Sequence, residues 1–429
     1  MKKWIALLCV LTLLLSMFSI SLAAEADLAT PEEGASLVYW SMWNETEPQG
    51  QVIAQAIEAF VAETGIPVEV NWNGRNIRQT LEPALAGGEV IDIFDEDVRR
   101  MLNNWGQYTL GLDAYVNAAY DGVVYRDTVN HSLISLAEQL GEAKGFEDGN
   151  KLHNIPYQPS AFVVMYNKAL FEKAGITAVP TTWEEFTAAC ESLKAIGVAG
   201  ITVDDAYIAD LLGYTMDRIA GSEAVIDMVS NVDFSHPCVL KAGELWEEMA
   251  RNGWISANAA SNVYPAAQIS EIAQETAAMY LNGTWLPNEI KSSAPDIQWG
   301  AFAFPAIDAE GDGTEANYYG GQSFGINKDT LYPNACFALV RWLTTGEWDQ
   351  ALADASMGVP MANNATWPVE LADAKAVIDS TTKWIPMAVT LRDNTEINAA
   401  VKAAFQKLIR GDYTAQQFAD DLAGLTASN

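Results

Sequence analysis

Strand-like and helix-like apolar patterns alternate along most of this 429-residue chain. Residues 36–41 and 67–72 predict strands, and apolar residues at helical spacing over 52–61 predict a helix between them. A helix over 77–85 and a strand over 90–94 continue the alternation. Strands separated by helices pair in parallel, so the pattern predicts an α/β fold with helices packed on a central sheet.

The middle and the end of the chain continue the alternation of strand-like and helix-like patterns, and no flexible linker interrupts it. Residues 162–166 (FVVMY) predict a buried strand, Thr182 and Glu185 fit a capping box that opens a helix, and residues 395–429 predict helices. About 400 residues exceed what one hydrophobic core usually serves, so we expect two domains. Because no low-complexity tether separates them, the chain should pass between the domains through strands or hinges.

The N-terminus has the layout of a secretory signal peptide, which we assign to residues 1–26. Lys2 and Lys3 precede an almost unbroken apolar run over 5–15. Small residues typical of a cleavage site follow at Ala23, Ala24 and Ala26. The alternative is a membrane anchor, which serines at the end of the run disfavour. Cys9 lies inside the run, too early to carry a lipid on the mature chain, so we expect no lipid anchor.

The charge of the chain excludes several classes of partner. The sequence has 24 basic and 56 acidic residues, and without Lys2, Lys3 and Glu25 the formal charge is −33. Phosphate backbones and anionic lipids repel such a chain, so we expect no nucleic-acid partner and no membrane-surface binding. The same charge would suit a cationic ligand.

Cysteine and histidine spacing points to no metal and no cofactor. Three cysteines remain after residue 26, which allows one internal disulfide at most and no disulfide framework. They are Cys190, Cys238 and Cys336. No spacing resembles a zinc site, and His131, His153 and His236 are far apart in the sequence.

Two patterns resemble catalytic motifs. Residues 321–325 read G-x-S-x-G, the nucleophile elbow of α/β-hydrolases, but all three histidines precede Ser323, so no later histidine completes the triad. An acidic run could supply the paired carboxylates of a glycosidase, accept hydrogen bonds from ligand hydroxyls, or form a solvated turn. It comprises Asp92, Asp95, Glu96 and Asp97.

Tryptophans follow two predicted strands, where a ligand platform is expected. Trp40 and Trp43 end the first strand, and polar residues come directly after them. Residues 282–285 (NGTW) deliver another tryptophan through a tight turn. Ligands of open α/β sheets bind beyond the carboxyl ends of the strands. Aromatic faces with a few polar groups suit a sugar, which has an apolar C–H face and many hydroxyls.

Several segments resemble a known family. Residues 166–176 (YNKALFEKAGI) and 180–186 (PTTWEEF) are similar to the extracellular solute-binding proteins of family 1, the sugar-binding receptors of ABC importers, maltodextrin-binding ones included. Segments 277–285, 302–305 and 320–326 agree in type and order, so the resemblance covers the whole mature chain. Residues 156–158 (PYQ) depart from the commonest form, and the missing lipid-attachment cysteine favours a periplasmic location.

The resemblance implies a type II-like periplasmic-binding-protein fold of two α/β lobes. Residues 35–160 plus 321–345 would form lobe one, and residues 161–320 plus 346–429 would form lobe two. The chain would cross near 158–163, 319–322 and 344–347. The implied function is that of a non-enzymatic receptor, periplasmic or extracellular and monomeric, which closes around a sugar or oligosaccharide and delivers it to ABC permease subunits.

Carried over position by position, the resemblance also implies which residues line the cleft between the lobes. Lobe one would contribute Trp43, Asn44, Glu45, Asp95 and Glu96. Lobe two would contribute Asp204, Tyr207 and Trp285. Ser160 and Gln322, near the crossings, are further candidates.

Two alternatives stay open at this point. The same fold could bind a non-sugar solute such as a polyamine or a glycerol-phosphate type of compound; the charge of −33 favours a cation, whereas the tryptophans favour a carbohydrate. A secreted glycosidase that uses the acidic run over 92–97 is the second alternative.

Overall fold

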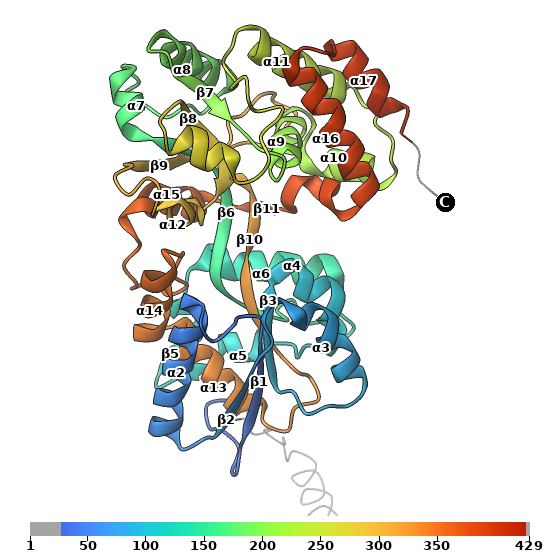
Figure 1. Cartoon of the computed structure of the whole chain (residues 1–429). Coiled ribbons are helices and arrows are strands. Elements are labelled where there is room, and N and C mark those ends of the chain that lie inside the picture. Colours follow the sequence, from blue (N-terminus) through green and yellow to red (C-terminus); the bar gives the residue numbers. More distant parts are fainter. Residues whose placement is uncertain (1–26, 426–429) are drawn as a thin grey trace, which may run out of the picture.

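The computed structural model describes residues 27–425 and shows two α/β lobes that share one sheet (Figure 1). The predicted signal peptide, residues 1–26, lies outside the described residues. The strand order is β2-β1-β3-β10-β6-β8-β7, with β11 paired to β10 and β9 paired to β6. The strands of this sheet are β1 (Leu37–Ser41), β2 (Val68–Trp72), β3 (Ile93–Asp97), β6 (Ile155–Asn167), β7 (Ala199–Thr202), β8 (Ala277–Gly283), β9 (Trp299–Phe302), β10 (Ala316–Ile326) and β11 (Lys383–Ile385).

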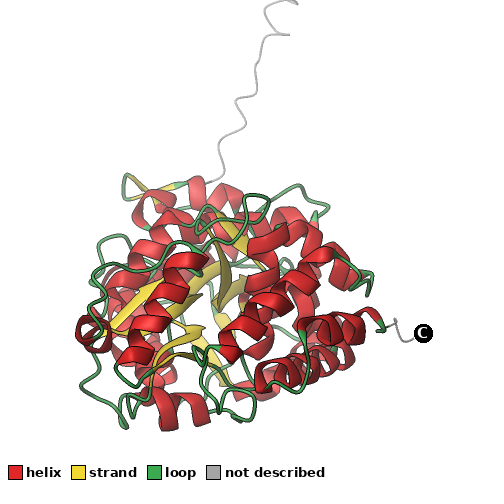
Figure 2. Cartoon of the chain, turned by 90° about the horizontal axis from the view of Figure 1, so that it is seen from above, coloured by secondary structure: helices red, strands yellow, loops and turns green. Residues whose placement is uncertain are grey.

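Helices cover the strands on both sides, as the view from above shows (Figure 2). The α-helices of at least five residues are α2 (Pro48–Thr64), α3 (Ile77–Ala86), α5 (Asp113–Asn117), α6 (His131–Lys144), α7 (Lys168–Lys173), α8 (Trp183–Ala195), α9 (Ile208–Ala220), α10 (Ser222–Ser230), α11 (Pro237–Arg251), α12 (Leu286–Ile290), α13 (Pro333–Thr344), α14 (Gly346–Ser356), α15 (Ala372–Ser380), α16 (Thr395–Arg410) and α17 (Ala415–Ala423). The α/β fold expected from the sequence is therefore confirmed.

Lobe one forms around the three strands that the N-terminal pattern predicted, although the third runs over Ile93–Asp97 rather than 90–94. β1 pairs in parallel with both β2 and β3. Pro48 occupies the first turn of α2, where its missing N–H costs nothing, and Gly65 ends the helix in the left-handed conformation. Ile53 and Phe60 bury one face of this helix, and Phe60 packs edge-on against Trp342 of α13. The helix therefore packs against both its own strand unit and a helix from much later in the chain.

Lobe two is built in the same way around β7, β8 and the second half of β6. The capping box predicted at Thr182 and Glu185 is present and opens α8. Trp183, in its first turn, lies edge-on to the fully buried Trp246 of α11 at 5.7 Å between ring centroids. Phe405 of α16 contacts the same tryptophan, so the C-terminal helices close this core.

Two long antiparallel strands connect the lobes. In lobe one the second half of β10 pairs with β3, from Gln322 opposite Asp97 to Ile326 opposite Ile93. In lobe two the start of β10 pairs with β11, while the end of β6 pairs with β8 and β9. Between these parts β10 and β6 pair with each other throughout (Figure 1). The hydrogen-bonded sheet thus passes directly from one lobe to the other.

A β-bulge interrupts the pairing at the point of crossing. The register shifts between Gly321 and Gln322, which leaves Gln158 without an opposite residue. Gln158 has φ 43° and Gly321 has φ 111°, both in the left-handed region. A Cβ added to Gly321 would lie 2.6 Å from the Cα of Pro159, so this position requires glycine.

One predicted lobe limit needs correction. The third crossing was expected at 344–347, but α14 packs against α2, within lobe one (Figure 1). The backbone continues on that lobe, since the N–H of Asn130 donates to the carbonyl of Met361 and the N–H of Asn363 donates to that of Thr128. α15 then contacts β9 of lobe two. The crossing therefore lies after Asn363, while the remaining limits stay a prediction.

An ion pair also joins the lobes beside the crossing strands. Arg99 follows β3, and its Nη1 lies 2.5 Å from Oδ1 of Asp393, which ends the short helical segment η7 (Met387–Asp393) in lobe two. Both side chains are partly exposed, so the pair contributes at most about 1 kcal/mol. It favours the observed arrangement of the lobes without locking it.

Two further features bear on the sequence-based expectations. None of the helices within residues 27–425 has both the length and the apolar character needed to span a membrane. Cys190, Cys238 and Cys336 are each buried with a free thiol.

Replacing Gly321 with Ala should destabilise the protein more than an ordinary loss of glycine at positive φ. The left-handed backbone alone costs about 1–3 kcal/mol, and the contact with Pro159 adds to this. The free energy of unfolding in urea measures the loss. Gly65→Ala is the matched control, because Gly65 has φ 73° and nothing within 4 Å of an added Cβ. Equal losses in the two variants would contradict the steric argument.

Candidate functional site

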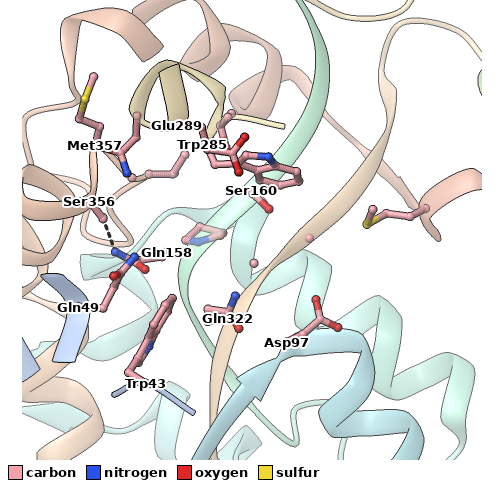
Figure 3. Close-up of a pocket in the computed structure, with 18 of the residues that line it drawn as sticks. Trp43, Gln49, Asp97, Gln158, Ser160, Trp285, Glu289, Gln322, Ser356 and Met357 are labelled. Carbon is pink, nitrogen blue, oxygen red and sulfur yellow. Dashed lines mark hydrogen bonds between the residues drawn. The ribbon is translucent and has the colours of Figure 1, made fainter. Parts of the chain in front are cut away.

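A cleft lies between the lobes where β6 and β10 cross (Figure 3). Its volume is about 410 Å³, within the range of small-molecule sites. The lining residues come from both lobes and from the crossing strands. They are Trp43, Gln49, Asp97, Gln158, Pro159, Ser160, Tyr207, Thr284, Trp285, Asn288, Glu289, Gly320, Gly321, Gln322, Ser356, Met357, Gly358, Val359 and Met387.

Trp43 bounds the cleft from lobe one (Figure 3). It follows β1, and its indole Nε1 donates a hydrogen bond of 2.8 Å to the hydroxyl of Tyr157. The guanidinium of Arg75 lies 4.5 Å from the ring centroid and forms an ion pair of 3.0 Å with Glu47. These contacts fix the indole, so lobe one presents a rigid aromatic edge to the cleft.

Trp285 faces the cleft from lobe two (Figure 3). It follows the turn that ends β8, and its ring lies directly over Gly283, where an added Cβ would be 2.1 Å from the indole. Phe162 of β6 packs edge-on against the same ring at 5.0 Å between centroids. The indole can occupy this position only if residue 283 has no side chain. The glycine of the Asn-Gly-x-Trp turn therefore determines where the Trp285 ring lies.

The crossing strands form the floor, and two of its polar atoms have no partner. Ser160 is 8% exposed and its Oγ makes no hydrogen bond to any described residue; the same holds for the buried Oε1 of Gln322. Gln158 differs, since its amide donates to Ser356 and to the carbonyl of Leu352. Buried polar groups normally have partners, so the floor offers one donor–acceptor and one acceptor to a bound molecule.

Two carboxyl groups give the cleft its electrostatic character. Asp97 ends β3 and accepts a 3.0 Å hydrogen bond from the N–H of Arg100. Glu289 of α12 accepts from the hydroxyl of Tyr264 at 3.0 Å. Burial raises the pKa of both carboxyls. Among the described residues that line the cleft there is no Lys or Arg, so its charged groups are these two carboxyls.

The described residues contain no group of three or more His, Cys, Asp or Glu side chains that could hold a metal ion. The acids of the run over 92–97 are engaged separately. Asp92 accepts hydrogen bonds from the N–H of Val38 and the hydroxyl of Thr330, whereas Glu96 forms ion pairs. Of these four acids, Asp97 lines the cleft.

Five of the ten residues singled out from the sequence line the cleft together. They are Trp43, Ser160, Tyr207, Trp285 and Gln322. Their contact with a ligand stays a prediction, but they come from both lobes and from the crossing strands, as the resemblance implied.

Two of the other five lie in the turn after β1, away from the cleft lining. Asn44 uses its backbone N–H and its side-chain amide to bind Glu47 at 2.7 and 3.0 Å, and Glu45 is exposed to solvent. Asn44 is therefore bonded to the residue that precedes α2. The expectation that they line the cleft is corrected accordingly.

Asp95, Glu96 and Asp204 are also held elsewhere. Asp95 is fully buried beneath Trp43, where it accepts hydrogen bonds from the N–H of Met42 (2.9 Å) and the hydroxyl of Tyr157. Glu96 binds Arg78 at 3.0 Å. Asp204 is buried and accepts from Tyr280 at 2.7 Å. Each carboxylate is therefore satisfied by its own lobe, which corrects their predicted place in the lining.

Several lining residues were not among those predicted to line the cleft. Asp97 was named in the acidic run but not in the predicted lining; it reaches the cleft because β3 extends to it and successive side chains of a strand point to opposite faces. Asn288 and Glu289 lie in α12, directly after the motif at residues 282–285, so their closeness to Trp285 in the sequence could have indicated them. The segment 356–359 carried no signal in the sequence. It lines the cleft because the chain stays on lobe one until after Asn363, later than predicted.

Comparison with known proteins decides the family. Residues 43–350 match the family model described as bacterial extracellular solute-binding protein. The chain belongs to this family. The match includes the turn after β1, the crossing strands β6 and β10, and the turn that carries Trp285, so most of the elements that form the cleft of this solute-binding protein lie within it. The lining residues 356–359 and Met387 lie beyond it.

Curated relatives share about a quarter of their residues with this solute-binding protein. A candidate binding protein of Brucella abortus (strain 2308) is 25% identical over 318 residues, which cover 73% of this chain and 71% of the relative. The multiple sugar-binding protein of Streptococcus mutans serotype c is 27% identical over 236 residues, 51% of this chain and 53% of the relative.

Solved structures share the fold at lower identity. The apo form of RafE from Streptococcus pneumoniae superposes with a TM-score of 0.71 at 19% identity, over 92% of this chain and 97% of that one. RafE in complex with raffinose superposes with a TM-score of 0.64 at 18% identity, over 91% and 98%. An open conformation of a candidate binding protein, msmE of Bacillus subtilis, gives 0.70 at 17% identity, over 93% and 97%.

Replacing Gly283 with Ala should displace the Trp285 ring from the cleft. The added methyl group would occupy the position of the indole, so the ring must turn away. Intrinsic tryptophan fluorescence should change in this variant. The control is the same substitution in a Trp285→Phe background, where the fluorescence change should disappear. An equal change in both backgrounds would mean that Gly283 affects other tryptophans.

Asp95 should make the protein less stable as the pH rises from 4 to 6. Burial raises its pKa from 3.8 to about 6, so in this window the folded state holds a proton that the unfolded state has lost. The contribution falls by roughly 3 kcal/mol across the window and stays low above it. Asp95→Asn cannot titrate, so its free energy of unfolding in urea should fall less over this range. Parallel curves for the two proteins would refute this.

Proposed function

We propose that this solute-binding protein is the receptor of an ABC importer and that it captures a neutral sugar or oligosaccharide in the cleft. The observation that carries the proposal is the pair of indoles, Trp43 and Trp285, which face one cleft from opposite lobes above a floor with unpartnered polar atoms. Aromatic faces match the C–H face of a pyranose, and the floor can bind its hydroxyl groups.

The relatives support a carbohydrate over other solutes. One curated relative is a multiple sugar-binding protein, and RafE was solved with raffinose. The lining of this cleft is consistent with that class, because amides, two serines and two carboxyls surround the indoles. Such groups both donate to and accept from hydroxyls.

Closure of the lobes is the proposed mechanism. A ligand shifts an equilibrium between open and closed forms only if it binds the closed form better, which requires contacts from both lobes. The crossing strands can bend at the bulge that contains Gln158 and Gly321. Since Ser160 and Gln322 flank this bulge, a ligand on the floor would contact the hinge itself.

The alternatives fit the cleft less well. A glycerol-phosphate type of solute would need a cation, which the described lining does not provide. A polyamine would suit Asp97 and Glu289, but it would leave the indoles and the amides of the floor without a role. A glycosidase that pairs two acids of the 92–97 run is disfavoured, because of these acids Asp97 lines the cleft and the other three are held by their own lobe.

The cellular setting belongs to the same proposal. A monomer exported by a cleaved signal peptide, without a lipid anchor, would work in the periplasm or outside the cell and deliver its sugar to the permease subunits of the importer. Binding without catalysis is expected, so a bound oligosaccharide should be recovered unchanged after incubation.

Replacing Trp285 with Ala should abolish most of the affinity for the sugar while leaving the fold intact. A thermal-shift panel of sugars, oligosaccharides, polyamines, amino acids and metals first identifies a ligand of the native protein. Titration calorimetry should then show a loss of roughly 10- to 100-fold in the variant, as expected for about 1.5–3 kcal/mol of apolar burial.

The matched control is Trp254→Ala, since the Trp254 indole binds Glu191 on the outer side of lobe two. Retained affinity in Trp285→Ala would disprove the assignment of the site. If polyamines are the only compounds of the panel that bind, the receptor function stands and the proposal of a carbohydrate ligand is overturned.

A further inference from the structure

An exposed apolar segment borders the cleft on lobe two. Val263, Tyr264 and Ile269 are 67%, 39% and 43% exposed. Among the exposed large apolar side chains of the described residues, Tyr264 is the one aromatic. Together with Val263 and Ile269 the ring forms part of an exposed apolar segment, and such contiguous surfaces often mark binding sites.

Tyr264 connects directly to two residues that line the cleft. Its hydroxyl donates to Oε1 of Glu289 at 3.0 Å. Its ring lies edge-on to Tyr207, with 5.9 Å between centroids and 81° between the planes. The ring of Tyr207 in turn lies 6.4 Å from that of Trp285. Three aromatic rings thus form a continuous series from inside the cleft to its outer edge.

The backbone around Tyr264 is fixed before any ligand arrives. The N–H of Tyr264 donates to Oδ1 of Asp205 at 2.8 Å. The preceding Asn262 is buried and donates from its amide to Glu271 at 2.7 Å and to the carbonyl of Val203 at 3.2 Å. An aromatic ring held in place in this way loses little conformational entropy on binding.

The charges near this edge are unsuited to an acidic ligand. Asp205 and Glu289 flank Tyr264. Arg392 lies over the ring of Tyr207, but it forms an ion pair of 2.6 Å with the buried Asp210. The surface next to Tyr264 therefore combines an aromatic face with hydrogen-bond acceptors, which favours an uncharged polyhydroxylated group.

We propose that Tyr264 is an outer subsite for the second or a later ring of a neutral oligosaccharide whose first ring lies between Trp43 and Trp285. This rests on the proposed function and narrows it, because a single sugar would not reach Tyr264. The ligand leaves the cleft along Tyr207 and passes over Glu289, whose second oxygen is held by Gln268 at 3.2 Å. Affinity should therefore increase with the number of rings.

Titration calorimetry with two sugar series tests the subsite: galactose, raffinose and stachyose, and xylose with its oligomers of two to four rings. In the native protein, affinity in the series that binds should rise about tenfold or more from its shortest to its longest member. Tyr264→Ala should remove this rise, with a smaller loss of affinity for the shortest member than for the longest. Tyr264→Phe keeps the ring and should retain most of the rise, and Leu331→Ala, an exposed apolar residue of lobe one, should change nothing.

The outcomes separate the two proposals. Equal affinity for short and long members, or an equal loss for all members in Tyr264→Ala, overturns the subsite and leaves the receptor intact. Unchanged binding of every sugar by Tyr264→Ala, together with reduced sugar uptake in cells, would assign the segment to a protein contact instead. If no sugar binds the native protein, the carbohydrate proposal fails and the subsite fails with it.

Discussion

The pairing of β6 with β10 is the interaction on which the rest of the structure depends. These two strands belong to both lobes, so the lobes are joined by backbone hydrogen bonds rather than by a tether. The bulge at Gln158 and Gly321 lies in this pairing and also in the lining of the cleft. Any movement of the lobes therefore bends the same strands that form the floor of the site, and the site and the hinge are one element.

The two indoles are held by opposite means. In lobe one, Trp43 is held by two buried hydrogen bonds in series. Its indole donates to the hydroxyl of Tyr157, which donates to Asp95. In lobe two the absence of a side chain at Gly283 makes the room for Trp285. The first solution costs stability, because burial raises the pKa of the Asp95 carboxyl and its charge is unfavourable at neutral pH. A loss of stability of this kind is common near binding sites, where the position of a side chain matters more than the stability of the fold.

The sequence predicts the architecture well and the site in part. Alternating periodicities predicted the strands, and the Asn-Gly-x-Trp turn identified Trp285, since both signals are local. The acidic run shows the limit of this prediction. Glu96 and Asp97 are consecutive, yet Glu96 pairs with Arg78 and Asp97 lines the cleft. Which of them reaches the cleft depends on the face of β3 on which each lies and on where β3 ends. The path of α14 and the position of Tyr264 depend on packing between distant segments, which no local pattern in the sequence records.

The same shared sheet restricts the order in which the chain can fold. β3 is complete at residue 97, but its neighbour in the sheet, β10, ends at residue 326, with most of lobe two between them. Until that return strand is available, β3 remains an open edge that can pair with other chains. Contacts so distant in sequence form slowly, and neither lobe corresponds to one continuous fragment. The sheet is therefore completed only after β10 has been synthesised, and both lobes depend on that step. A truncated chain that ends before β10 would retain the exposed edge.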